Sequence, residues 1–161
     1  MTSVEHDPVE AARDLAQLDG LTALRAMIAG ELPPPPIATL LGFDLVEVDE
    51  GRAVFAAHPG EEHYNPIGMV HGGLAATLID SATGCAVHTT LPAGTGYTTT
   101  DVQVRFVRPI TLDTGRIECI GEVVHRGRTL ATAEARVVAG ERLLAHGTAS
   151  LLILPSGART G

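Results

Sequence analysis

The chain has 161 residues, of which 45% are apolar and only 3% aromatic, so one domain with an aliphatic core is expected, with room for a short arm. Its formal net charge is −8 and all eleven basic residues are arginine, which excludes Schiff-base chemistry through lysine and argues against nucleic-acid binding. It shows no signal-peptide pattern, no apolar run near the ~20 residues that span a bilayer, and no CxxC pair. We therefore expect a soluble, cytoplasmic protein without membrane or nucleic-acid partners.

The first 36 residues are expected to form a helical arm. Asp7 can cap a helix and Pro8 suits its first turn, and apolar residues then recur at roughly helical spacing until Gly30, with an interruption near Gly20. The prolines of residues 33–36 should form an extended spacer outside any helix. We divide the chain into an arm with its linker, a main domain and a flexible tail, at residues 1–36, 37–155 and 156–161.

The main domain is predicted to contain two strands, a helix and four more strands. The helix, expected over Leu74 to about Thr90, is apolar almost all round and should therefore be buried on every side. Short turns predict antiparallel pairing and a meander of the last four strands. The fold class is thus α+β, an antiparallel sheet wrapped around a long central helix. The predicted strands are Phe43–Val48, Arg52–Ala57, Tyr97–Val107, Arg116–Val124, Thr129–Val138 and Leu143–Leu154.

The motif His71-Gly72-Gly73 lies where a loop becomes this helix. The first N–H groups of a helix lack internal partners and the helix dipole is positive there, so the Gly72 N–H can stabilise a carbonyl oxygen that gains negative charge. Gly73 would let a substrate approach the backbone closely. His71 could be a base or could fix the loop by hydrogen bonding, and the two glycines could serve tight packing alone.

Asp80 is the only charged residue between Val70 and Asp101, inside an otherwise apolar helix. A buried carboxylate is costly, so we expect either a structural hydrogen bond to a neighbouring hydroxyl or, in preference, a role as general base or nucleophile. The Asn65 amide, in the loop upstream, could position water or the substrate carbonyl, or could only form a turn before Pro66.

The spacing of Gly72 and Asp80 has a consequence for assembly. The two residues are eight positions apart, which is about 12 Å along a helix. One carbonyl group is too small to touch both. If both act on one carbonyl, Asp80 must come from a second copy of the helix that runs the other way, as in a two-fold dimer with two equivalent sites.

Other residues lack a pattern that predicts chemistry. The histidines show no metal-ligand spacing, so no metal site is expected. Ser81 lacks a Gly-x-Ser-x-Gly turn and Cys85 lies in the middle of the helix, so neither is expected to be a nucleophile.

Residues 65–73, Asn-Pro-Ile-Gly-Met-Val-His-Gly-Gly, followed by Asp80, resemble the hotdog-fold acyl-CoA thioesterases of the PaaI-like group. The resemblance extends over about residues 38–154 and includes Arg105-Phe106-Val107-Arg108-Pro109, His125-Arg126-Gly127-Arg128 and Ala145-His146-Gly147-Thr148-Ala149. It implies a hotdog fold, dimers that often pair into tetramers, and hydrolysis of acyl-CoA thioesters. It implies no separate cofactor, because coenzyme A is part of the substrate.

The resemblance also implies roles for individual residues. Asp80 would be base or nucleophile, Gly72 the oxyanion donor, and Asn65 would orient water or substrate. A hydroxyl on the strand after the helix often assists, and Thr99 is the best match. The cations that could meet the phosphates of CoA are Arg105, Arg108, Arg126 and Arg128, the last two being preferred because they flank Gly127 on a tight turn.

Two other functions stay open from the sequence. A hotdog (R)-enoyl-thioester hydratase or dehydratase would pair a catalytic histidine with an acidic residue, and only His88, two turns beyond Asp80, could be that partner. A non-catalytic acyl-CoA-binding protein could use the same pocket, with the arm of residues 1–36 as a partner-binding element.

Overall fold

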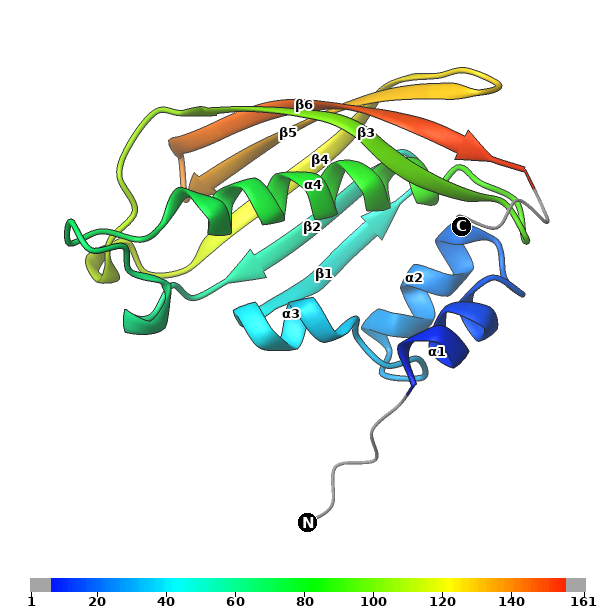
Figure 1. The fold of residues 1–161 in the computed structure, drawn as a ribbon, viewed down its shortest axis with the longest axis horizontal. Coiled ribbons are helices and arrows are strands. Elements are labelled where there is room, and N and C mark those ends of the chain that lie inside the picture. Colours follow the sequence, from blue (N-terminus) through cyan, green and yellow to red (C-terminus); the bar gives the residue numbers. More distant parts are fainter. Residues whose placement is uncertain (1–6, 156–161) are drawn as a thin grey trace, which may run out of the picture.

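The computed structural model describes residues 7–155, which form one six-stranded antiparallel sheet curled around a long helix (Figure 1). The helix, α4, spans Gly72–His88. The strands are β1 Phe43–Asp49, β2 Arg52–Ala57, β3 Gly96–Phe106, β4 Ile117–Arg126, β5 Leu130–Ala139 and β6 Arg142–Leu154. The predicted α+β hotdog arrangement, with helices before the first strand, is confirmed.

The strand order is β1-β2-β4-β5-β6-β3, so the predicted meander is right for the last three strands and wrong for β3. β3 pairs with β6, from Gly96 opposite Leu154 to Phe106 opposite Ala145. Its connection to β4 contains the short 3-10 helix η2, Leu112–Thr114, and crosses one end of the sheet (Figure 1). The length of a turn does not predict this crossing. The position of β3 depends on its pairing with β6, a strand far along the chain.

One face of α4 packs directly on the sheet. A Cβ added at Gly121 of β4 would lie 2.3 Å from the backbone oxygen of Ala82, so the glycine permits this close approach. The side chains of α4 that are buried against the sheet include Leu74, Leu78, Ile79, Ala82 and Val87.

The opposite face of α4 is not covered, which corrects the expectation of a helix buried on every side. Ala76, Thr77 and Ser81 are half-buried, and Asp80 is exposed. A single sheet curls around only part of the circumference of the helix. The uncovered residues share one side because they follow one another at intervals of three and four positions.

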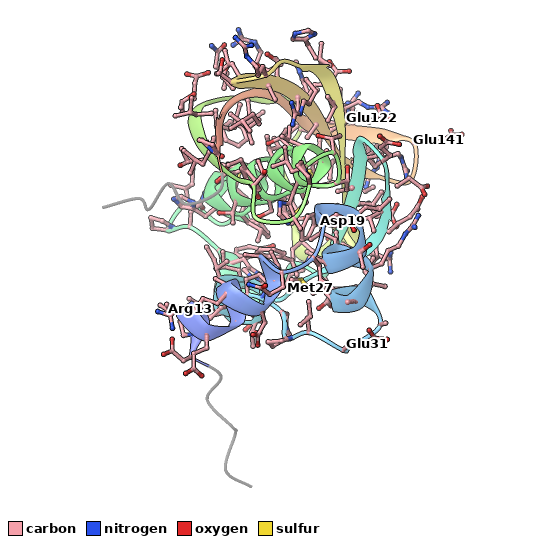
Figure 2. The ribbon with its side chains drawn as sticks, turned by 90° about the vertical axis from the view of Figure 1, so that its right-hand side faces the viewer. Arg13, Asp19, Met27, Glu31, Glu122 and Glu141 are labelled. Carbon is pink, nitrogen blue, oxygen red and sulfur yellow. The ribbon has the colours of Figure 1, made fainter. Side chains whose placement is uncertain are left out.

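The arm consists of two helices, α1 Pro8–Leu15 and α2 Gly20–Ile28, because Asp19 starts a new helix by accepting a hydrogen bond of 3.0 Å from the Thr22 N–H. α2 packs on the main domain, where Leu24 joins a buried cluster with Val48, Ala53 and Ala86. Figure 2 shows the two arm helices beneath the sheet and α4.

The proline segment differs from its prediction at one position. Pro33–Pro35 are not helical, as predicted, but Pro36 begins the short helix α3, Pro36–Leu41. The first turn of a helix tolerates proline because its N–H groups have no helical partner there. The tail predicted at residues 156–161 lies outside the described residues. Within residues 7–155, no helix combines the length and apolarity needed to cross a membrane.

Candidate active site

His71 is the N-cap of α4. Its Nδ1 accepts a hydrogen bond of 2.8 Å from the Gly73 N–H, and its backbone oxygen accepts one of 3.1 Å from Leu74. The Gly72 N–H has no hydrogen-bond partner among residues 7–155. Of the two glycines named as possible ligand contacts, Gly72 therefore keeps its donor free, whereas the donor of Gly73 is used by the cap.

A pocket of about 540 Å³ opens in front of this helix start. Gly72 lies against the ring of Phe106, since a Cβ at this position would be 2.9 Å from two of its atoms, and no other residue type would fit without a shift. The residues that line the pocket include Asn65, His71, Gly72, Phe106, Arg108 and Ile110.

Asn65 forms the turn that was one of the two roles considered for it. Its Oδ1 accepts hydrogen bonds from the N–H groups of Ile67, at 3.1 Å, and Met69, at 3.2 Å, which closes the turn. Its side-chain nitrogen makes no hydrogen bond within the described part of the chain, although Asn65 lines the pocket. That nitrogen is therefore a donor available to a ligand.

The buried His63 positions this loop, a role that was not predicted. Its Nδ1 accepts a hydrogen bond of 2.8 Å from the Gly60 N–H, its Nε2 lies 2.9 Å from the Leu41 oxygen, and its own backbone oxygen accepts one of 2.7 Å from the His71 N–H. The sequence carries no signal for this role, because the partners are backbone groups from separate segments.

Asp80 and Thr99 form the second group of site residues. The Thr99 hydroxyl donates a hydrogen bond of 2.8 Å to Asp80 Oδ1. The pairing of β3 with β6 has a bulge here, as Thr99 faces Leu151 and Asp101 faces Ser150, which leaves Thr100 without a partner of its own. Bulges re-aim side chains next to functional sites. The expected burial of Asp80 is wrong for the single chain, whose carboxylate is exposed on the uncovered side of α4.

The other titratable groups near α4 do not join Asp80. Burial raises the pKa of Cys85 to about 12, so this thiol is not ionised near neutral pH. Burial lowers the pKa of His88, whose ring lies 5.6 Å from that of Tyr97. Within residues 7–155, Asp80 bonds to no histidine, and no group of three or more His, Cys, Asp or Glu could hold a metal ion.

The preferred cations do not lie near Gly72 in this chain. Arg126 and Arg128 are at the turn between β4 and β5, which Figure 1 shows at the opposite end of the molecule from the start of α4. Arg108 does line the pocket at Gly72, and it donates a hydrogen bond of 2.7 Å to the Leu143 oxygen. Within one chain, Arg108 is the better placed cation for a phosphate.

Comparisons with known proteins indicate the family of the chain. Residues 67–146 match the model of the thioesterase superfamily. The chain is 33% identical over 118 residues to a protein from Halobacterium salinarum that is named as an esterase. The match covers 70% of this chain and 76% of that one. It is also 33% identical over 87 residues to human acyl-coenzyme A thioesterase 13, covering 54% of this chain and 61% of that one.

Two solved structures show the same fold. A thioesterase family protein from Silicibacter pomeroyi superposes with a TM-score of 0.73 at 26% identity, covering 82% of this chain and 98% of that one. A mutant form of the phenylacetic acid degradation protein PaaI from Thermus thermophilus superposes with a TM-score of 0.66 at 28% identity, covering 73% of this chain and 97% of that one.

Proposed function

The chain belongs to the thioesterase superfamily, and on that premise we propose that it hydrolyses acyl-CoA thioesters to a free acid and CoA. The observation that carries the proposal is the placement of two complementary groups on one straight helix. A free N–H at Gly72 can bind an oxyanion, and the carboxylate of Asp80, oriented by Thr99, can activate a nucleophile.

The two groups serve different thioesters within one dimer. They are about 12 Å apart along α4, so each reaction centre takes Gly72 and Asn65 from one chain and Asp80 and Thr99 from the other. The uncovered side of α4, with Asp80 exposed among half-buried small residues, is the surface that a second α4 would cover. β3 is also an edge of the sheet, and an eleven-residue edge strand favours pairing with another copy. Dimers of this kind can pair further into tetramers.

The reaction is a hydrolysis. Asp80 accepts a proton as water attacks the thioester carbonyl, the Gly72 N–H stabilises the resulting oxyanion, and the Asn65 side-chain nitrogen orients the water or the carbonyl. Collapse of the intermediate breaks the C–S bond, and the proton returns to the CoA sulfur. Alternatively, Asp80 attacks directly and water then cleaves the anhydride. A single turnover in oxygen-labelled water identifies direct attack when water opens the anhydride at the Asp80 carbonyl, because only this route transfers label into the carboxylate of Asp80.

Subunit mixing tests the shared site. Chains with Asp80→Ala and chains with Asn65→Ala should each be nearly inactive alone. After unfolding and refolding together in equal amounts, half of the dimers are mixed and each has one intact site, so about a quarter of wild-type thiol release should return. Recovery that stays at the level of the single variants contradicts the shared site.

The same assay decides between the competing functions. Release of CoA from acyl-CoA that disappears with Asp80→Ala supports hydrolysis. Addition of water to an enoyl-CoA without CoA release would identify a hydratase, and binding of acyl-CoA without either reaction would identify a binding protein.

The two free cysteines, Cys85 and Cys119, suit a reducing compartment, and we place the reaction in the cytoplasm.

A further inference from the structure

A second cavity lies between the arm and the main domain. It has a volume of about 560 Å³, within the range of ligand pockets. We call it the arm pocket. Its outer wall is made by α2 and the Pro33–Pro35 segment, and its inner wall by β1, β2, the last turns of α4 and the start of β3. Its lining includes Met27, Cys85, His88 and Tyr97.

The arm pocket begins about one helical turn beyond Asp80. Tyr97 and Thr99 are alternate residues of β3 and therefore share the face of that strand that points to α4. Thr99 bonds Asp80, while Tyr97 lies against the next turn, since a Cβ added at Gly84 would be 2.8 Å from its hydroxyl oxygen. Cys85, which lines the pocket, is about 7.5 Å beyond Asp80 along the helix.

The charge of the arm pocket distinguishes it from the pocket at Gly72. Among its lining residues, all of them within residues 7–155, none is an arginine, and Asp44 is the one acid. His88 stays neutral near pH 7, because burial lowers its pKa. The phosphates of CoA would meet no cation here, whereas Arg108 lines the pocket at Gly72. The arm pocket therefore suits the apolar half of a thioester and not the CoA half.

His88 gives an independent sign that this cavity is not closed by packing alone. Both of its ring nitrogens are buried and neither has a hydrogen-bond partner among the described residues. A neutral ring must carry its proton on one of them. Buried polar atoms are nearly always paired, so a ring with two unpaired nitrogens beside the arm pocket indicates that this end of the main domain is not packed as a completed core.

We propose that the arm pocket takes the acyl chain of the thioester whose carbonyl lies at Asp80, and that the arm sets the length of chain accepted. The proposal rests on the proposed hydrolysis and adds its substrate class, an acyl group with an extended apolar chain. The arm precedes the matched residues 67–146 and acts here as the outer wall of the site. Met27 is the residue best placed to change the depth of the pocket, since it is half-buried on α2, on the side that faces α1 (Figure 2).

The test measures kcat/KM for a series of straight-chain acyl-CoAs. In the wild type, kcat/KM should rise about fourfold for each added methylene until the pocket is full, which corresponds to ~0.8 kcal/mol per methylene. Met27→Trp should end the rise at a shorter chain and lower kcat/KM for the longest chains by about sixteenfold, through loss of about two methylene contacts. Met27→Ala should move the end of the rise to longer chains.

Thr22→Trp is the matched control, because Thr22 is exposed on the same helix and does not line the pocket. It should leave the chain-length profile unchanged. An unchanged profile in both Met27 variants, or an equal loss for all chains, would overturn the proposal. If the wild type releases no CoA from any acyl-CoA, the proposed hydrolysis fails instead. Calorimetric binding of free fatty acids to the wild type and Met27→Trp then tests the pocket separately, and equal binding by both would overturn it.

Discussion

The hydroxyl of Thr99 on the edge strand β3 donates a hydrogen bond of 2.8 Å to Oδ1 of Asp80 on α4, nineteen positions earlier in the chain. A carboxylate with four lone-pair sites is held by this one bond in the described residues, so most of its acceptor capacity faces outward. This relationship turns an exposed aspartate into an oriented one.

Replacing Asp80 tests whether the carboxylate takes part in the chemistry. Asp80→Asn keeps the shape and the bond from Thr99 but removes the ability to accept a proton, so kcat should fall about 10²- to 10⁴-fold in a thiol-release assay. The thermal unfolding midpoint should change little, because the asparagine keeps the size of the side chain and the hydrogen bond from Thr99. Asp113→Asn, at an exposed aspartate in η2, should retain wild-type kcat, and an Asp80→Asn enzyme as active as this control would exclude the proposed role.

Replacing Thr99 tests orientation apart from proton transfer. Thr99→Val removes the hydroxyl with little change in shape, and kcat/KM should fall about three- to tenfold, since one intramolecular hydrogen bond contributes about 1 kcal/mol. Thr99→Ser should restore most of the activity.

Thr98 supplies a control on the same strand. Its side chain points to the other face of β3, so Thr98→Val should have little effect. If Thr98→Val and Thr99→Val lower kcat/KM equally, the strand is merely sensitive to valine and the bond to Asp80 is not the cause.

His71 offers a way to separate capping from base catalysis. His71→Ala removes the acceptor for the Gly73 N–H and should lower the free energy of unfolding by about 0.5–2 kcal/mol, as measured in urea. His71→Asn can cap the helix and should keep both stability and, within about threefold, activity. A 10²-fold loss of kcat in a stable His71→Asn enzyme would instead show that the imidazole acts as a base.

His88 should make stability depend on pH. Its folded-state pKa is lowered from 6.5 by burial, so near pH 7.5 the ring is neutral in both states and has no effect. As the pH falls through 6.5, His88 is protonated in the unfolded chain but stays neutral in the folded chain. The free energy of unfolding therefore decreases until the pH reaches the folded-state pKa of His88.

Urea unfolding at pH 7.5 and pH 5.5 measures this dependence. His88→Leu should show a smaller decrease than the wild type between the two pH values. His146→Gln, which replaces an exposed histidine of β6, should decrease as the wild type does. If His88→Leu loses as much stability as His146→Gln on acidification, other groups cause the decrease.

The sequence by itself predicted the order of the strands and the long helix of the main domain, and it proposed where the chemistry lies. Alternation of apolar residues marks each strand, and the run from Leu74 onward marks a helix with a buried face. Gly72 and Asp80 could be identified because both signals are local: one is a helix start and the other a lone charge in an apolar segment. Their separation was also readable, since helical rise converts position directly into distance.

Only the tertiary structure decided which strand lies beside β6, which face of α4 stays uncovered, and how Thr99 meets Asp80. These features depend on long-range pairing and on a bulge at Thr100, which local patterns do not encode. The arm pocket likewise exists only because α2 docks on the main domain, with the Gly20 N–H bonded to the Leu91 oxygen at 3.0 Å. Segments far apart in the chain form that cavity, so no local sequence pattern predicts it.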